Sequence, residues 1–454
     1  MIHRARSLAV RSLRVLQRNA RLAARKRTAN WAPEMEPLAV DGGLPVREPS
    51  LRPWASMRDD YHRDWRADIG PAFRAIHARG VEGLPQPLAT QFGEAWAQAC
   101  ESRFGLMVGH GTDALRIGLA AVLEHDGLDY GGEIIVPNFS FIASATAALD
   151  RRFGVALVDV DSSTLLLDPR RAEEAIVAGR TRAIMAVHLF GQPADMTAIG
   201  DVARRHNLKV IEDAAQAHGA SWLGRPVGSI GAVGAFSFQS SKSLSAGEGG
   251  ALVTSDADVF DRAYSMQNVG RMRKNGARWE HVSLGWNCRP TEYQAALLLT
   301  RLKRFGDQQT RRAANVAYLR RLLGEIRSVE PLGVRTEVSA HGMYMFAMRY
   351  RPESCDDMPI DEFVSILSME GMPIFRAFAS TIAEQPAIQR LAESRPEYVR
   401  ALKTPVSDRA ARTTLYIPHS VFLGTRTDMD DIATGLRKVE QQVATSRYWR
   451  QQRH

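Results

Sequence analysis

Two residues in the middle of the chain, Asp213 and Lys242, have the types and the setting for covalent chemistry on a bound ligand. Asp213 follows the apolar run 208–211, which is short enough for a buried strand. Lys242 follows a second strand-like run, 233–238, and a third run, 251–254, comes after it. We therefore expect each residue on a loop beside a strand end, where small neighbouring residues let a ligand come close.

An acid and a lysine placed in this way suit pyridoxal phosphate (PLP). The lysine amine would form a Schiff base with the cofactor aldehyde, and the acid would keep the pyridine nitrogen protonated so that the ring can accept electrons. Each residue also has a simpler interpretation, with Asp213 as a helix cap and Lys242 as a solvated loop lysine. The pair, in this strand-and-loop context, favours the cofactor.

The residues around this pair form long motifs. EDAAQAHG at 212–219, FSFQSSK at 236–242 and GEGG at 247–250 resemble the DegT–StrS family of PLP-dependent sugar and cyclitol aminotransferases. The resemblance covers roughly residues 37–443. It implies the aspartate-aminotransferase type of fold (PLP fold type I), with a large α/β domain around a mainly parallel mixed sheet and a smaller α+β C-terminal domain. It also implies an aminotransferase that uses glutamate or glutamine as donor and works by a ping-pong mechanism.

Four residues take cofactor roles by the same resemblance. Gly111 and Thr112 bind the PLP phosphate, at the start of a helix expected after the strand 104–108. Free backbone N–H groups and the helix dipole attract anions at such a place. Ser237 also contacts the phosphate, and Gln216 lies against the ring near its phenolic oxygen.

The resemblance further implies an aromatic residue over the ring and a contribution from a second subunit. Phe141 takes the stacking role, with Phe139 as the rival, although either could be ordinary core. In the motif 285–296, Asn287 reaches the phosphate of the neighbouring subunit, which implies a homodimer with shared active sites. The alternative for Asn287 is a helix cap. Pro290 departs from the apolar residue usual in the family and fits the first turn of the following helix.

His188, Gln239 and His419 are the candidate substrate contacts. His188 follows the expected strand 181–187 and could equally satisfy a hydrogen bond in the core. Gln239 stands where the nucleotide-sugar branch often has histidine, and it resembles the cyclitol and aminohydroxybenzoate branches. The leading expectation for the acceptor is a nucleotide-linked keto sugar, because this substrate is the commoner one. The alternative is a keto cyclitol of the scyllo-inosose type.

Functions of other classes compete with transamination. A sugar dehydratase of the same fold has histidine in place of the lysine. Lys242 argues against this enzyme but leaves lysine-bearing eliminases open. A non-catalytic, regulatory PLP-binding relative would lose Lys242, Asp213 or Ser237, and this chain keeps all three. A membrane-associated scaffold would act through the basic tail. Glu248, in the GEGG turn, is expected to shape the loop and not to react.

The elements that must position these residues follow from the periodicity. Strands alternate with helices between residues 104 and 254, which predicts a mainly parallel sheet with helices on both faces. A chain of 454 residues suffices for two domains. We expect a tail at 1–35, a PLP-binding large domain at 36–300, a smaller domain at 301–446 and a tail at 447–454. The smaller domain should contain a long helix at 301–326 and an amphipathic helix at 428–443.

Composition and charge exclude other classes of function. The net charge of +9 matches the nine Lys and Arg residues that precede the first acid, Glu34, so the remaining chain is near neutral. A basic groove for nucleic acid is therefore not supported. The tail could be solvated, lie on an anionic membrane or act as a transit peptide. Cys100, Cys288 and Cys355 have no metal-type spacing and read as reduced cytoplasmic thiols, and no apolar run is long enough for a membrane span.

Overall fold

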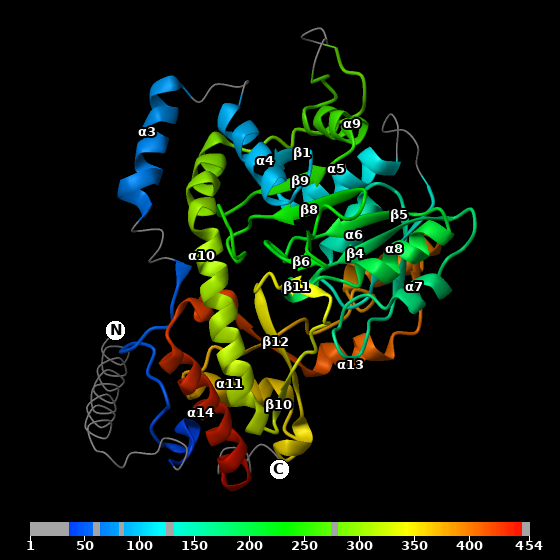
Figure 1. Cartoon of the computed structure of the whole chain (residues 1–454). Helices are drawn as coiled ribbons and strands as arrows, with labels where there is room; N and C mark the ends of the chain where they lie inside the picture. The colour runs from blue at the N-terminus through cyan, green and yellow to red at the C-terminus, as the bar shows by residue number, and fades with distance from the viewer. Residues whose placement is uncertain (1–35, 58–63, 81–85, 124–130, 274–279, 447–454) are drawn as a thin grey trace, which may run out of the picture.

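The computed structural model of the chain describes residues 36–57, 64–80, 86–123, 131–273 and 280–446 (Figure 1). The expected tails at 1–35 and 447–454, and with them the three interpretations of the basic tail, lie outside the described residues. A search of the described part finds no helix that is both long enough and apolar enough to cross a membrane.

An eight-stranded mixed sheet forms the larger part of the molecule, in the order β1-β9-β8-β5-β4-β2-β3-β14. Only β9 runs against its two neighbours, and the other strands share one direction. The strands are β1 Phe104–Val108, β2 Glu133–Pro137, β3 Gly154–Val158, β4 Thr181–Val187, β5 Lys209–Asp213, β8 Val233–Ser237, β9 Gly250–Thr254 and β14 Val399–Ala401. The expected mainly parallel sheet is confirmed.

Helices cover both faces of this sheet, because side chains alternate between the faces along each strand. One face packs against α5 (Gly111–Leu123), α6 (Ala143–Asp150) and α9 (Ala257–Gln267). The other face packs against α4 (Pro87–Ala99), α7 (Pro169–Glu174) and α8 (Met196–Arg205). In β9, for example, Leu252 joins the first core while Ala251 and Val253 join the second.

The helix α10 (Glu292–Leu322) links this sheet to a smaller one and runs most of the height of the molecule in Figure 1. It begins earlier than the expected residue 301, because Thr291 and Gln294 form a capping box that fixes its start. Pro290 precedes this cap, so its expected place in the first helical turn is wrong. The helix α3 (Gly70–Arg79) lies beside α10.

The smaller sheet has the order β10-β12-β15-β13 and packs with α11 and α14. Its elements are β10 Val329–Pro331, β12 Met345–Tyr350, β13 Phe375–Arg376, β15 Thr414–Pro418, α11 Ile360–Met369 and α14 Arg426–Gln442. A third sheet joins β6 Ser221–Trp222, β7 Arg225–Pro226 and β11 Val338–Ala340. The α/β body with a second, smaller α+β part therefore matches the fold class expected from the sequence.

Segments from both sides of residue 300 belong to the part of the molecule that lies across the expected domain boundary. The strand β14, which lies between α12 (Pro386–Ser394) and α13 (Pro405–Thr413), pairs with β3 at the edge of the large sheet. Conversely, Leu38 and Val46 pack in the core of the smaller sheet. The large sheet thus includes a C-terminal strand, and the smaller core includes an N-terminal segment.

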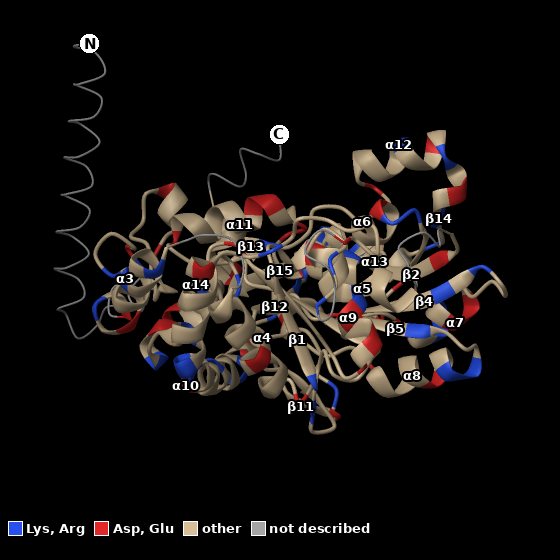
Figure 2. Ribbon diagram, turned by 90° about the horizontal axis from the view of Figure 1, so that it is seen from above, with Lys and Arg blue, Asp and Glu red and all other residues tan. Residues whose placement is uncertain are grey.

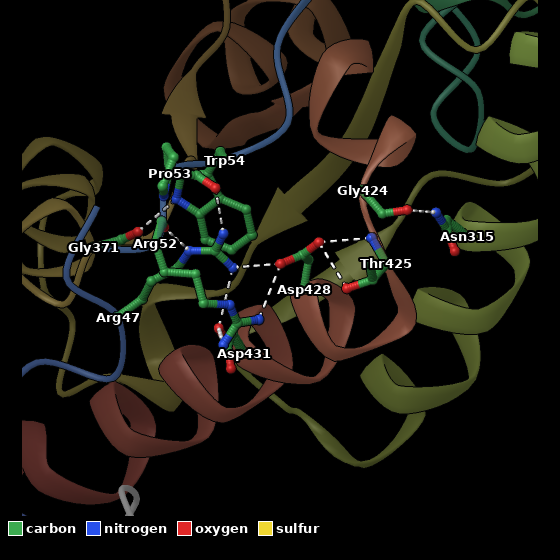
Figure 3. Close-up of polar contacts among 10 residues, drawn as sticks. All are labelled: Arg47, Arg52, Pro53, Trp54, Asn315, Gly371, Gly424, Thr425, Asp428 and Asp431. Carbon is green, nitrogen blue, oxygen red and sulfur yellow. Dashed lines mark hydrogen bonds and ion pairs between the residues drawn. The ribbon is translucent and has the colours of Figure 1, made fainter. Parts of the chain in front are cut away.

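We call residues 36–57 the N-terminal strap. Its Arg47 is 1% exposed and donates to Asp428 at 2.7 Å and to Asp431 at 3.1 Å, both on α14 (Figure 3). The guanidinium lies 3.6 Å from the centroid of the Trp54 ring, whose Nε1 donates to Gly371 O at 2.9 Å. A buried cation with two carboxylates and an aromatic ring therefore fastens the strap to α14.

Figure 2 shows both basic and acidic segments on helices such as α7 and α8. Several of these charges form exposed pairs along one helix, such as Arg171 with Glu174 and Arg204 with Asp201. Interspersed charges of both signs are typical of a solvated surface.

Candidate active site

The expected site residues converge at the carboxyl ends of the parallel strands. The strands β3 and β4, which follow β2 in the chain, pair with opposite sides of β2, so the strand order switches there. Ligands of α/β proteins bind at such switch points. A cavity of about 610 Å³ lies at this edge. Of the expected residues, it is lined by Gly111, Thr112, Phe141, Asp213, Gln216, Ser237, Gln239 and Lys242.

Lys242 lies on the loop that joins β8 to β9. Burial lowers the pKa of its amine to about 8, although the Asp213 carboxylate partly offsets this effect. The amine lies 4.4 Å from the centroid of the Tyr344 ring. Tyr344 immediately precedes β12. A lysine with such a pKa exchanges protons close to neutral pH.

Asp213 is the last residue of β5 and is 6% exposed. Its Oδ2 accepts a 2.6 Å hydrogen bond from Ser144 Oγ on α6, and its Oδ1 accepts from the Ala215 N–H at 3.2 Å. Among the described residues, no cationic side chain comes within ion-pair distance of it. A buried carboxylate without such a partner suits a ligand that brings its own positive charge.

The phosphate-binding expectation falls on the start of α5. A Cβ on Gly111 would lie 2.5 Å from Ser237 Cβ, so only glycine allows the end of β8 to approach this closely. The first N–H groups of a helix have no intrahelical acceptor, and the helix dipole adds a partial positive charge. Gly111, Thr112 and Ser237 thus line one concave corner with free donors for an anion.

The two phenylalanines after β2 have different surroundings. Phe141 is 56% exposed and lines the cavity. Phe139 is 1% exposed and packs edge-to-face on Phe378 with ring centroids 5.5 Å apart. Only Phe141 is therefore in a position to stack on a ligand ring, as the sequence led us to expect, while Phe139 belongs to the core.

Two cavity-lining amides are braced by the backbone. Gln216 Oε1 accepts from the Phe190 N–H at 2.8 Å, which supports the left-handed conformation of Phe190, with φ of 60°. Gln239 Oε1 accepts from the Ser241 N–H at 2.9 Å, and its Nε2 donates to Ser240 Oγ at 2.7 Å. Gln239 thus lines the cavity and also holds the lysine loop.

The structure places His188 in the core and not in the cavity. It is fully buried, its Nδ1 accepts from the Ala194 N–H at 3.0 Å, and its Nε2 therefore donates to Glu212 at 3.0 Å. Glu212 also accepts from the backbone N–H groups of residues 228, 230 and 231 at 2.6–2.7 Å. These contacts support the alternative role of His188 as a hydrogen-bonded core residue and give no support to a substrate contact.

His419 lies behind the lysine loop. Its Nε2 donates to Ser241 O at 3.0 Å, and its ring stacks on Tyr344. His218 binds the start of the loop through a 2.8 Å hydrogen bond to Ser237 O. Burial lowers the pKa of each histidine to about 3, so both stay neutral. His419 does not line the cavity, so its expected substrate contact remains a prediction.

Asn287 does not line this cavity. It is exposed and forms a β-bridge with Asn268. On the same segment, Met272, Val282 and Leu284 expose 45%, 49% and 58% of their surface. Its expected reach into the site of a neighbouring subunit remains a prediction.

The sequence did not point to several residues of the site. Tyr344, Ser140, Phe378 and His110 line the cavity, and Ser144 supports Asp213. The only signal for His110 was its place in the glycine turn before α5. Glu248, expected as a turn residue, lines the cavity and pairs with His110 Nδ1 at 3.1 Å.

Known aminotransferases are similar to this chain in sequence. The L-glutamine:scyllo-inosose aminotransferase of Streptomyces griseus is 36% identical over 77% of this chain and 85% of its own. The L-glutamine:2-deoxy-scyllo-inosose aminotransferase of Streptomyces fradiae is 33% identical over 89% of this chain and 98% of its own.

Solved structures share the fold. The crystal structure of 3-amino-5-hydroxybenzoic acid (AHBA) synthase has a TM-score of 0.73 and 28% identity over 87% of this chain and 98% of its own. NtdA from Bacillus subtilis, solved with bound cofactor PMP, has a TM-score of 0.71 and 25% identity over 84% and 82% of the two chains. The profile of the DegT/DnrJ/EryC1/StrS aminotransferase family matches residues 71–437. The chain belongs to this family and is an aminotransferase.

Proposed function

We propose that the protein is a PLP-dependent aminotransferase that transfers the amino group of L-glutamine to a keto cyclitol of the scyllo-inosose type. The observation that carries the proposal is that Asp213, Lys242, Phe141 and the Gly111–Ser237 corner line one cavity. Its volume of about 610 Å³ falls within the roughly 300–1,000 Å³ of small-molecule sites.

The residues of the cavity fit PLP. Asp213, a buried carboxylate supported by Ser144, would hold the ring nitrogen in its protonated form, because a nearby opposite charge favours the charged state. The corner beside Gly111 would hold the phosphate, and Phe141 would cover the ring face. When bound, the cofactor supplies an aldehyde that takes up amino groups and a ring that withdraws electrons from the reacting carbon.

The chain supplies the proton transfer. Lys242, whose pKa of about 8 lies near neutral pH, would remove the proton from the donor carbon and return it to the acceptor. The Tyr344 ring beside the amine would keep it inside the cavity after it is released from the cofactor. Both half-reactions would use the same lysine, which predicts ping-pong kinetics.

The acceptor is proposed from two observations. The relatives compared above are named for inosose acceptors and for L-glutamine as donor. In addition, Gln239 stands in the cavity where a nucleotide-sugar branch often has histidine. These observations favour the keto cyclitol over the nucleotide-linked keto sugar that the sequence led us to expect first.

The acceptor assay uses the full chain loaded with PLP and L-glutamine as donor. We expect mass spectrometry to detect the amine formed from scyllo-inosose or its 2-deoxy analogue, at rates well above those with nucleotide-linked keto sugars. Amination of nucleotide-linked keto sugars alone would replace the cyclitol proposal by its rival. If glutamine is converted to its oxo acid in a single turnover but no acceptor is aminated, the donor part of the proposal would stand and the cyclitol part would be rejected.

The cofactor assay does not depend on turnover. Borohydride reduction followed by peptide mass spectrometry should find the cofactor mass on the peptide that contains Lys242. The variant Lys242→Ala should lose this mass and all transamination, while Lys209→Ala, an exposed lysine at the start of β5, should retain both. Cofactor mass on another lysine would remove Lys242 from its role.

A further inference from the structure

A second cavity, of about 210 Å³, lies where the segment after β4 meets α10 and β12. We call it the α10–β12 cavity. Its wall is mostly apolar and includes Leu189, Val316, Leu332, Phe346 and Phe422. It is distinct from the catalytic cavity, although Met345 contributes to the walls of both.

One cation in this wall has no anionic partner. Burial lowers the pKa of the Arg320 guanidinium, which lies 5.4 Å from the centroid of the Phe346 ring. Its Nη2 donates to Leu332 O at 2.8 Å, and among the described residues no carboxylate lies within ion-pair distance of it. A partly desolvated charge without a counter-charge is unfavourable, so an anion bound here would be stabilised.

Two neutral donors accompany this cation. His341 Nδ1 accepts from the Met343 N–H at 2.9 Å, so the neutral ring carries its proton on Nε2. Gln192 is 5% exposed, and its side-chain Nε2 has no hydrogen-bond partner. The only other polar lining residue is Thr164, so the wall offers donors and a positive charge but no acid.

We propose that the α10–β12 cavity binds a small carboxylate with a short apolar chain. The carboxylate would receive hydrogen bonds from Arg320 and Gln192, and the chain would lie against the Leu and Phe side chains. The volume is below the roughly 300–1,000 Å³ of sites for drug-sized ligands, which restricts the occupant to a small acid. The site is separate from the proposed transamination and does not depend on it.

The binding test uses isothermal titration calorimetry on the PLP-loaded full chain. Butyrate and hexanoate are the probes, with hexanol as a chain without charge and formate as a charge without a chain. We expect saturable binding of the two acids and none of the two controls. Arg320→Met should weaken acid binding at least tenfold, or about 1.4 kcal/mol, and Gln192→Leu should weaken it several-fold.

The matched control is Arg321→Met, the next residue of α10, which is exposed and does not line the cavity. It changes the net charge equally and should bind the acids as the native chain does. Unchanged binding in Arg320→Met would show that the acids bind elsewhere, the catalytic cavity included, and would overturn the proposal. So would equal binding of hexanol, or no saturable heat with either acid.

A crystal soaked with a brominated short-chain acid decides the matter independently of the variants. The anomalous signal of bromine between α10 and β12 would support the site even if Arg320→Met does not fold. Bromine found only in the catalytic cavity or on the surface would overturn it.

Discussion

The buried carboxylate of Asp213 depends on a hydroxyl from another element. Ser144 comes from α6, sixty-nine residues before Asp213, and its 2.6 Å hydrogen bond fixes the orientation of the carboxylate toward the cavity. Hydrogen bonds to charged groups contribute roughly 1.5–3 kcal/mol. The serine therefore bears on how well the acid can hold a cationic ring.

We predict that Ser144→Ala weakens PLP binding about tenfold, because the carboxylate loses its strongest donor. Equilibrium dialysis of the apoprotein against PLP measures the affinity. The matched control is Ser407→Ala, since Ser407 is also fully buried and donates to a buried carboxylate, Asp159, at 2.8 Å. Both variants should lose some stability, but only Ser144→Ala should lose affinity for PLP. Equal affinities would contradict the role given to Ser144.

The pKa of Lys242 predicts a pH dependence for the apoprotein. Burial lowers this pKa to about 8, so the reactive neutral amine should become half-populated near that pH. Labelling of Lys242 by acetic anhydride, followed by mass spectrometry, should therefore rise through pH 8 and level off above it. In Asp213→Asn the midpoint should move lower, because the carboxylate that favours the charged amine is gone. A midpoint that does not move would show that the two groups do not interact.

At the residue scale, the sequence identified side chains that belong to long motifs. Asp213 and Lys242 stood out by their chemistry and setting, whereas Gly111 and Phe141 were assigned only through the family resemblance. The sequence could not decide whether His188 contacts a substrate or forms a hydrogen bond in the core, because a histidine can serve in either role. Tyr344 could not be found either, because it approaches the lysine only when α10 brings the smaller sheet to the large one.

The loop between β8 and β9 is the element on which catalysis would depend. His218 binds Ser237 O, where the loop begins, and His419 binds Ser241 O beside Lys242. Both rings are buried and neutral, so they act as fixed donors over the whole working range of pH. The loop is therefore held by two side chains that do not line the cavity.

We predict that His419→Phe lowers kcat about tenfold with little change in the KM for glutamine. The substitution keeps the ring on Tyr344 but leaves the Ser241 carbonyl without its donor, a loss of about 1–3 kcal/mol. Steady-state kinetics measure the split between kcat and KM. His419→Gln, which retains an amide donor, should recover part of the rate. No recovery, or an effect on KM alone, would favour a direct substrate contact instead.

Element boundaries were predictable where one local signal dominates. The strands β1 and β4 begin and end at the expected residues, because each is a short apolar run. The start of α10 was placed nine residues late, since the apolar pattern was read without the capping box at Thr291. The strand β14 was not expected at all, because three residues with a central arginine carry no strand pattern.

At the scale of the whole molecule, the N-terminal strap joins segments more than 370 residues apart. Hydrogen bonds connect Arg47 to Asp428 and Asp431. On its own, burial would raise the pKa of Asp428, but hydrogen bonds from Thr425, Arg47 and Arg52 outweigh it and lower the pKa to about 2. The cluster therefore contributes stability that depends on pH.

We predict that Arg47→Met lowers the free energy of unfolding by about 3 kcal/mol near neutral pH. Because the folded pKa of Asp428 is depressed, its contribution is fully present above the ordinary 3.8 and is lost as the pH falls through about 2. The penalty of Arg47→Met should shrink over this window. Urea unfolding at several pH values measures it, with Arg327→Met as control, because Arg327 is 81% exposed in its pair with Glu440. A penalty independent of pH would mean that packing on Trp54 dominates.

The proposed sharing of active sites between subunits gives a prediction for the assembly. Mixing inactive Asn287→Ala and Lys242→Ala chains should restore part of the activity, because hybrid dimers would contain one site with neither substitution. Light scattering measures the oligomeric state, and mass-tagged chains show that subunits exchange. Exchange without any restored turnover would place Asn287 outside the neighbouring site.

The contacts of the N-terminal strap with α14 and of β14 with β3 have a consequence for biosynthesis. Until residues 399–431 have been synthesised, the nascent polypeptide has a strap without its partners on α14, and a main sheet that lacks β14 at one edge. Neither the large sheet nor the strap can therefore be completed before these residues leave the ribosome. A premature stop codon even near residue 395 should therefore yield a product that chaperones and proteases recognise, and not a smaller enzyme.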